Sequence, residues 1–170
     1  MGRGSVSYFA EWEKITNKVF ELVKNNEPLM KYICNPSQYP LSDSSPIWKE
    51  VFMRNFFPMP KDPLSISDQK CFLNIYINSA YPYEENPYFR QDYLNIDVGC
   101  HLETWPVENG RIRPYIICDL VDEMLNNKNI SNISIQKVLN GGVKILKFGD
   151  MYYGYKLTYK MSNTGALDCE

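Results

Sequence analysis

Two long stretches of the chain carry apolar residues at intervals of three and four. Between Ser5 and Asn26 these positions form one stripe, and charged or amide side chains occupy the opposite side. The stripe consists of Phe9, Trp12, Ile15, Val19, Leu22 and Val23. The same spacing returns after Arg113-Pro114 and ends at Asn126-Asn127. The pattern predicts two long amphipathic helices, and Glu27-Pro28 opens a short third one through Ile33.

Two other stretches place apolar residues at every second position. Residues 70–79 and 93–102 each place their apolar side chains on one face, which predicts two half-buried strands. The connection between them, residues 80–91, is longer than a tight hairpin turn. We therefore expect it to form a long ordered loop.

In the last third of the chain, the pattern of apolar residues predicts three further strands, at 133–139, 143–148 and 151–161. Asn140-Gly141-Gly142 lies between the first two of them, and Asn-Gly between apolar runs indicates a hairpin turn. Gly149-Asp150 marks a second turn.

These elements define an α+β fold. We expect an antiparallel or mixed sheet of about five strands, with the two long helices packed on one face. One domain is predicted over residues 5–161, with a proline-rich insert at 34–65. The small, polar residues 162–170 are expected to be disordered in the free protein.

Composition excludes several classes of protein. Hydrophobic residues make up 44% of the 170 positions, which is the globular range. No apolar run approaches the roughly 20 residues of a membrane span, and the first residues lack the apolar core of a signal peptide. The net charge is −2, and Lys and Arg are scattered among acids. Tight, direct binding of duplex DNA is therefore not expected.

The sequence offers little catalytic chemistry. The five cysteines contain no CxxC pair, so neither a disulfide framework nor a zinc site is predicted. Cys71, Cys100 and Cys118 fall in apolar-periodic segments and are expected to be core residues. His101 follows Cys100 on a strand, where neighbours point to opposite faces. We expect no enzyme activity, no catalytic residue, no cofactor and no metal site.

Aromatic residues suggest an interface instead. The chain has 13 tyrosines, and the 80–91 connection concentrates aromatic side chains between prolines. Tyrosine offers a large rigid contact area, and long ordered loops are usually functional. The predicted interface residues are Tyr81, Tyr83, Tyr88, Phe89, Arg90 and, after the second strand, Trp105. The alternative is a surface loop folded onto its own sheet.

The sequence resembles the tail-terminator and head-to-tail joining proteins of tailed bacteriophages in three features. These are the order of elements, the closing strand 152–159, and the entry into the second long helix, Arg113-Pro114-Tyr115-Ile116-Ile117-Cys118-Asp119-Leu120. The resemblance covers residues 5–161, and the insert at 34–65 departs from the simplest members. The composition is also similar to that of ring proteins of crAss-like phages.

This resemblance implies a virion protein of the neck, made in the host cytoplasm. Such proteins form homo-oligomeric rings, sixfold or twelvefold, that contact portal, neck or tail-tube proteins. DNA passes through the ring as a non-specific occupant of its lumen, and no membrane is involved. The alternative is a small intracellular adaptor or inhibitor module that binds other proteins as a monomer or dimer.

Overall fold

The computed structural model of the chain describes residues 8–61, 70–83, 86–138 and 142–163. The helices are α1 (Tyr8–Asn25), α2 (Glu27–Cys34), α3 (Trp48–Val51) and α4 (Arg113–Leu125), with 3-10 turns at Leu102–Thr104 and Glu108–Gly110. The strands are β1 (Phe56–Phe57), β2 (Cys71–Tyr83), β3 (Asn86–His101), β4 (Lys128–Ile130), β5 (Ile133–Lys137), β6 (Val143–Phe148) and β7 (Tyr152–Asn163).

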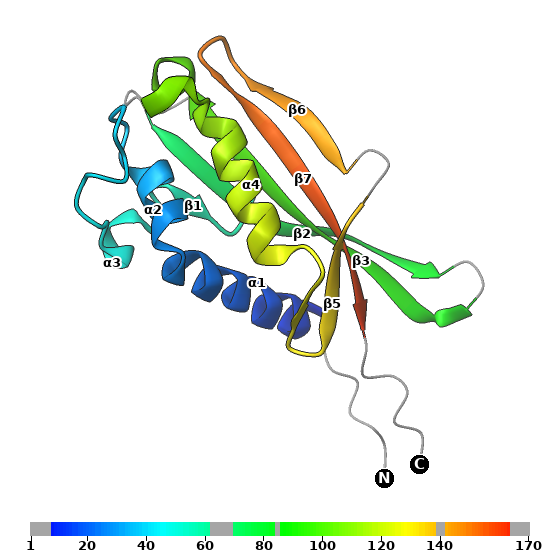
Figure 1. Ribbon diagram of the computed structural model, residues 1–170. Coiled ribbons are helices and arrows are strands. Elements are labelled where there is room, and N and C mark those ends of the chain that lie inside the picture. Colours follow the sequence, from blue (N-terminus) through cyan, green and yellow to red (C-terminus); the bar gives the residue numbers. More distant parts are fainter. Residues whose placement is uncertain (1–7, 62–69, 84–85, 139–141, 164–170) are drawn as a thin grey trace.

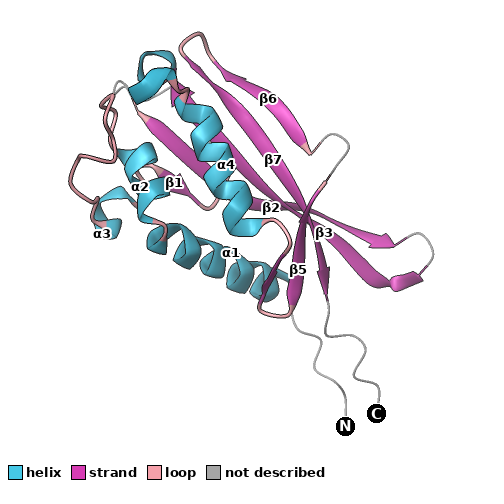
Figure 2. Ribbon diagram, in the orientation of Figure 1, coloured by secondary structure: helices cyan, strands magenta, loops and turns pink. Residues whose placement is uncertain are grey.

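The strands form one mixed sheet, with helices on one face (Figures 1 and 2). The order is β1-β2-β3-β7-β5-β4, β6 also pairs with β7, and only the β1–β2 pair is parallel. The predicted α+β class is confirmed. The sheet has seven strands rather than about five, because β1 and β4, with two and three residues, are too short to show an alternating pattern.

The core lies between this sheet and the helices. Alternation along β2, β3 and β7 directs one set of apolar side chains toward α1, α2 and α4. The strands contribute Leu73, Ile75, Leu94, Ile96, Val98, Leu157 and Tyr159, and the helices contribute Ile15, Val19, Val23, Leu29, Ile117 and Val121. All of these are at most 3% exposed, so the space between sheet and helices is closely packed. A second, smaller cluster of Phe57, Phe72 and Tyr152 packs apart from this core.

β7 joins the two halves of the sheet. One of its sides pairs with β3, and the other pairs with β6 over residues 152–157 and with β5 over residues 159–163. Val138 N–H donates to the Thr158 carbonyl at 3.0 Å, and Thr158 N–H donates to the Gly142 carbonyl at 2.7 Å. β5 and β6 therefore follow one another along β7.

The hairpin predicted at residues 140–142 is wrong. Both flanking strands run antiparallel to β7, so the chain continues in one direction instead of reversing; residues 139–141 themselves lie outside the described part. The predicted Gly149-Asp150 turn does form a hairpin, between β6 and β7, and a second tight hairpin joins β4 to β5. Ser131 and Asn132 at its turn have φ of 52° and 65°, the left-handed conformation that two-residue hairpins require.

The connection expected at residues 80–91 is not a loop either. β2 continues to Tyr83 and β3 begins at Asn86, so the segment forms a hairpin whose tip, residues 84–85, lies outside the described residues. Register shifts after Ile77 and after Pro82 interrupt the alternation. Because of these irregularities, the sequence lacks the regular alternation from which strands are predicted.

β3 pairs with β7 only from Asp92 onward, and within residues 86–91 the register pairs Asn86, Arg90 and Gln91 with β2. This end of the β2–β3 hairpin extends beyond the rest of the sheet (Figure 1). We call residues 80–83 and 86–91 the arm.

A buried arginine fixes the entry to α4. Arg113 is 0% exposed. Its Nε donates to the Thr104 carbonyl at 2.6 Å, and its Nη1 donates to the Tyr32 and Asn35 carbonyls, both at 2.7 Å. Nη2 donates to the Ser37 carbonyl. One side chain thus ties the C-terminal end of α2 and the start of the proline-rich insert to α4.

The domain limits differ slightly from those predicted. β7 continues to Asn163, so the first two residues of the segment predicted to be disordered belong to a strand, and residues 164–170 lie outside the described part. The insert at 34–65 contains α3 and β1 and is described to Lys61. The ring centroids of Trp48 in the insert and Phe20 in α1 lie 5.9 Å apart, and this contact holds the insert against the domain.

Candidate functional site

The structure places most of the predicted interface residues on the arm. Tyr81 and Tyr83 belong to β2, and Tyr88, Phe89 and Arg90 belong to β3. Tyr81 pairs with Gln91, and Pro82 pairs with Arg90. The side chains of these five predicted residues lie outside the described part, so their contacts stay a prediction. What the backbone shows is that one projecting element carries them all.

Two polar contacts hold the root of the arm. The indole Nε1 of Trp12 in α1 donates to Asp92 Oδ2 at 3.0 Å, and Asp92 is 5% exposed. The Asn95 amide donates to Asn78 Oδ1 across β2 and β3 at 2.8 Å. Both contacts lie where the hairpin leaves the sheet, so the arm projects from an anchored base.

Trp105 lies apart from the arm. Its Nε1 donates to the Cys100 carbonyl at 3.3 Å, and its half-buried ring packs against the main core. The Trp105 carbonyl accepts the Arg113 N–H at 2.8 Å. These contacts give Trp105 a role in positioning α4, and its role at an interface stays a prediction.

A buried polar network lies on the sheet face opposite the helices, and sequence reasoning missed it. Asp97 of β3 is 4% exposed, accepts the Tyr76 hydroxyl at 3.2 Å and lies 3.6 Å from Lys156 Nζ. Burial raises the pKa of the Asp97 carboxyl, and the Lys156 charge opposes that shift. Asn74 donates to the Lys61 carbonyl at 3.2 Å, so the insert covers this part of the face.

This network ties strands together and contains no nucleophile with a base. Thr158 of β7 donates to Asn95 of β3 at 3.1 Å, and Asn95 continues the chain to β2. The one signal in the sequence was the polar half of the β3 alternation, Asn95 and Asp97, which a sequence alone assigns to solvent.

Burial keeps three thiols protonated. Burial raises the pKa of Cys34 and of Cys118 to about 12, and it raises that of Cys100 well above its ordinary value. A thiol with so high a pKa is not a nucleophile near neutral pH. His101 is nearly buried; its Nδ1 accepts the Glu103 N–H at 3.3 Å, and its ring packs edge-on against Tyr152.

We expect His101→Ala and Cys100→Ala to leave the protein's assembly intact. Each residue packs in the fold and contacts its neighbours as described above, so each change costs only stability, about 1 kcal/mol for Cys100. Thermal melting measures the cost, and light scattering measures assembly. A variant that still folds and assembles but loses the protein's biological function would reveal a chemical site at this position.

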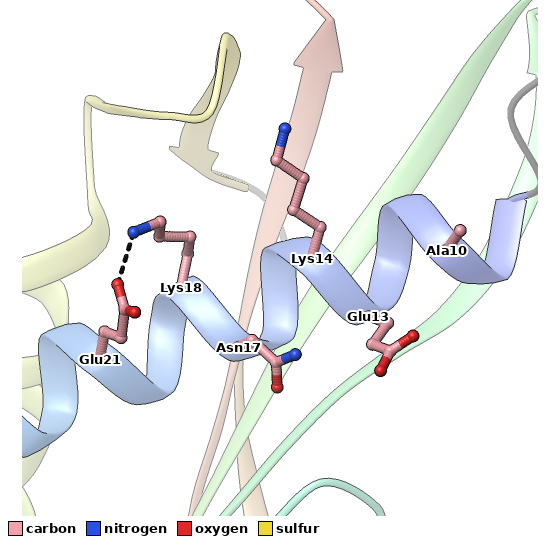
Figure 3. A pocket seen from close by; sticks show the side chains of 6 residues that line it. All are labelled: Ala10, Glu13, Lys14, Asn17, Lys18 and Glu21. Atoms are coloured by element: carbon pink, nitrogen blue, oxygen red, sulfur yellow. Dashed lines mark hydrogen bonds and ion pairs between the residues drawn. The ribbon is translucent and has the colours of Figure 1, made fainter.

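The described residues provide no metal centre and no membrane-spanning helix. Among them, no group of three or more His, Cys, Asp or Glu side chains is placed to hold a metal ion. None of the helices described here is long and apolar enough to cross a membrane. A hollow of about 340 Å³ lies on α1, and all six lining side chains come from that one helix (Figure 3). Lys18 and Glu21 pair across it at 2.5 Å, as on a solvated helix face.

The fold and these surfaces define a small α+β protein with a one-sided helical layer and a projecting hairpin. The chain belongs to the YomW family, whose model matches residues 26–161, from the N-cap of α2 to the end of the β3–β7 pairing. YomW is a Bacillus phage SPbeta-region protein, and the chain is therefore phage-associated, as predicted at this coarser level. No curated protein and no solved structure matches the chain.

Proposed function

We propose that this protein is a structural virion component that forms a ring at the head–tail joint of a tailed phage. In this proposal, six or twelve copies assemble through head-to-tail contacts and bind neighbouring portal, neck or tail-tube proteins. DNA passes through the ring without sequence-specific contact. Membership in a phage family supports the setting, and the arm is the observation that carries the proposed role.

The arm is suited to reach a neighbouring molecule. It projects beyond the neighbouring strands (Figure 1), and the β2–β3 pairs Tyr81–Gln91, Pro82–Arg90 and Tyr83–Asn86 order its backbone on both sides of the register shift. Pro82 and Pro87 stiffen it further. Docking a pre-ordered segment costs less conformational entropy than docking a flexible loop. Its sequence supplies aromatic anchors, which dominate binding energy at protein interfaces.

The double substitution Tyr88→Ala with Phe89→Ala tests this role. We expect assembly to weaken by a factor of about 100 or more, which corresponds to about 3 kcal/mol. The melting temperature of the monomer should change little, because the arm extends beyond the main core. Light scattering across concentration and negative-stain microscopy, with and without a portal or tail-tube protein, measure assembly.

A matched control removes two exposed apolar side chains elsewhere. Tyr39 and Ile47, both in the insert, are 57% and 59% exposed. The double change Tyr39→Ala with Ile47→Ala should leave assembly unchanged. If the arm variant unfolds, its rings belong to the domain core. If the wild-type protein forms a stable twofold dimer that ignores every neck partner, the ring proposal is wrong and the adaptor alternative gains support.

A further inference from the structure

Two cysteines face each other across the β2–β3 ladder. The register pairs Cys71 of β2 directly with Cys100 of β3, and both side chains point into the core, where they are 2% and 0% exposed. Both are free thiols in the structure. They are far apart in the sequence, so only the pairing of β2 with β3 brings them together.

We infer that Cys71 and Cys100 form a reversible disulfide when the protein meets a small-molecule disulfide such as oxidised glutathione. The pair is then a site of covalent modification that locks β2 to β3. This inference goes beyond the proposed function, because it holds whether or not the chain forms a ring.

The backbone hydrogen bonds place the two cysteines in a non-hydrogen-bonded pair. At the next position along the ladder, the His101 N–H donates to the Lys70 carbonyl at 3.2 Å. The Cys71 carbonyl points the other way, toward the insert, and accepts the Asn55 side-chain amide at 2.8 Å. Antiparallel pairs of this kind have their Cα atoms about 4.5 Å apart. Disulfides need a Cα separation of about 4.4–6.8 Å, so the bond can form without a large movement of either strand.

The surroundings favour Cys71 as the attacking thiol. Burial raises the pKa of Cys71, but the hydrogen bond with Cys100 lowers it. The positive charge of Arg113 and the contact with Thr104 Oγ1, 3.4 Å from the sulfur, lower it further, so the pKa of Cys71 lies below its ordinary value. Burial and the neighbouring Cys71 raise the pKa of Cys100. Since the thiolate is the nucleophile in disulfide exchange, Cys71 reacts first.

The reaction is an exchange in two steps. The Cys71 thiolate attacks one sulfur of oxidised glutathione, breaks its S–S bond and releases one glutathione thiolate. Cys100 then loses its proton and attacks the Cys71 sulfur of the mixed disulfide, which releases the second glutathione. The two protein thiols lose two electrons, oxidised glutathione gains them, and the two thiol protons pass to the released glutathiones. Cys71 in the mixed disulfide bears no charge, so it no longer raises the pKa of Cys100 in the second step.

The reagent reaches the buried pair through the end of the ladder. Cys71 is the first residue of β2, and Cys71–Cys100 is the outermost pair of the β2–β3 register at that end. The ends of ladders open at a lower free energy than the middle of a sheet. Opening here breaks the His101–Lys70 hydrogen bond and the contact of Asn55 with the Cys71 carbonyl. Oxidation therefore requires local opening and not global unfolding.

The bond encloses the β2–β3 hairpin, the arm included, in a covalent loop. A cross-link that closes a loop of this size stabilises a protein mainly by restricting the unfolded chain. We expect the oxidised protein to melt at least about 5 °C higher than the reduced protein. A reducing compartment leaves the pair open, and an oxidising medium closes it.

The test uses the full-length protein in buffers of reduced and oxidised glutathione, without denaturant and well below the melting temperature. Acid stops the exchange, free thiols are alkylated, and peptides are mapped by mass spectrometry. We expect a linked Cys71–Cys100 peptide from monomeric protein and the loss of two of the five thiols. The melting temperature should rise in parallel, and dithiothreitol should reverse both changes.

Cys118→Ala is the matched control. It removes a half-buried thiol of α4 that lies on no strand pair, so the linked peptide and the rise in melting temperature should remain. Cys71→Ala and Cys100→Ala should each abolish both. Each variant is compared with itself in reducing and oxidising buffer, so the stability lost through the substitution does not affect the comparison.

Three results would overturn the inference. The first is a wild-type protein that gives only mixed disulfides with glutathione, other cysteine pairs or no linked peptide. The second is a Cys71–Cys100 link that forms in denaturant alone. The third is a link that lowers the melting temperature, because the native pair would then be strained by the bond. Light scattering on the reduced protein tests the ring separately, so a failure of the proposed function leaves these results unchanged.

Discussion

Replacing Arg113 with methionine should remove about 4 kcal/mol from the free energy of unfolding. The guanidinium is fully buried, and the carbonyls of Tyr32, Asn35, Ser37 and Thr104 depend on it. Methionine fills similar space but donates no hydrogen bond. Buried polar groups without partners cost about 1–3 kcal/mol each, and relief from burying a charge offsets part of that loss. Since domains are stable by about 5–15 kcal/mol, the variant should be marginally folded.

Urea unfolding followed by tryptophan fluorescence measures this loss. Arg113→Lys should recover only part of the stability, because an ammonium group cannot span carbonyls that a planar guanidinium bridges. Arg111→Met is the control, since Arg111 is exposed and its change should stay within about 0.5 kcal/mol. A loss below about 1 kcal/mol for Arg113→Met would show that the four carbonyls find other donors.

Gly154→Ala should cost about 3 kcal/mol. Gly154 of β7 pairs with Gly99 of β3, and a Cβ atom there would lie 1.8 Å from the Val98 carbonyl oxygen. That oxygen is main chain in the middle of the sheet, so β3 and β7 would have to separate locally. Because β7 holds both halves of the sheet, the strain affects the pairing on which the whole fold depends.

Differential scanning calorimetry of Gly154→Ala and Gly110→Ala separates steric clash from backbone strain. Gly110 has φ of 69°, and a Cβ atom added there would meet no other atom within 4 Å. Alanine at this position therefore costs only the left-handed conformation, about 1 kcal/mol. Equal losses for the two variants would mean that the β3–β7 pairing adjusts without strain.

Sequence patterns predicted the parts of this fold that local periodicity governs. The helix over Phe9–Val23, the alternation of Leu73 and Ile75, and the Arg113-Pro114 helix start appear as expected. Within the predicted stripe, however, Phe9 and Leu22 are exposed, and Phe20 packs in the core instead. In each case the side that packs against the core is decided within a few residues. The helix layer, the core strands and the α+β class follow from such signals.

Pairing partners were not predictable in the same way. The Asn140-Gly141-Gly142 segment has a hairpin composition, yet its two flanking strands both pair with β7, and nothing local distinguishes the two arrangements. The arm was mistaken for a loop because shifts in register after Ile77 and Pro82 break the alternation. Such choices depend on residues far away in the sequence.

The same distinction applies to the candidate site, where composition predicted some residues and distant contacts decided the others. Aromatic composition singled out Tyr81, Tyr83, Tyr88 and Phe89, and the structure gathers their backbone positions on one hairpin. The buried states of Arg113 and Asp97 were not predictable, because charged residues are normally exposed. Arg113 is covered by α2 and the insert, and the insert also crosses the face that contains Asp97, as the Asn74 contact with Lys61 shows.

The position of β7 at the end of the described chain affects how the protein folds during synthesis. β7 joins β3 to β5 and β6, and its pairs are distant in sequence, as in Asp92 with Met161. Contacts between distant residues slow folding, because the chain must close large loops before they form. Until residues 152–163 have left the ribosome, one edge of β3 stays open, with Leu94, Ile96 and Val98 beside it. A nascent chain is therefore prone to aggregate in the interval just before β7 emerges.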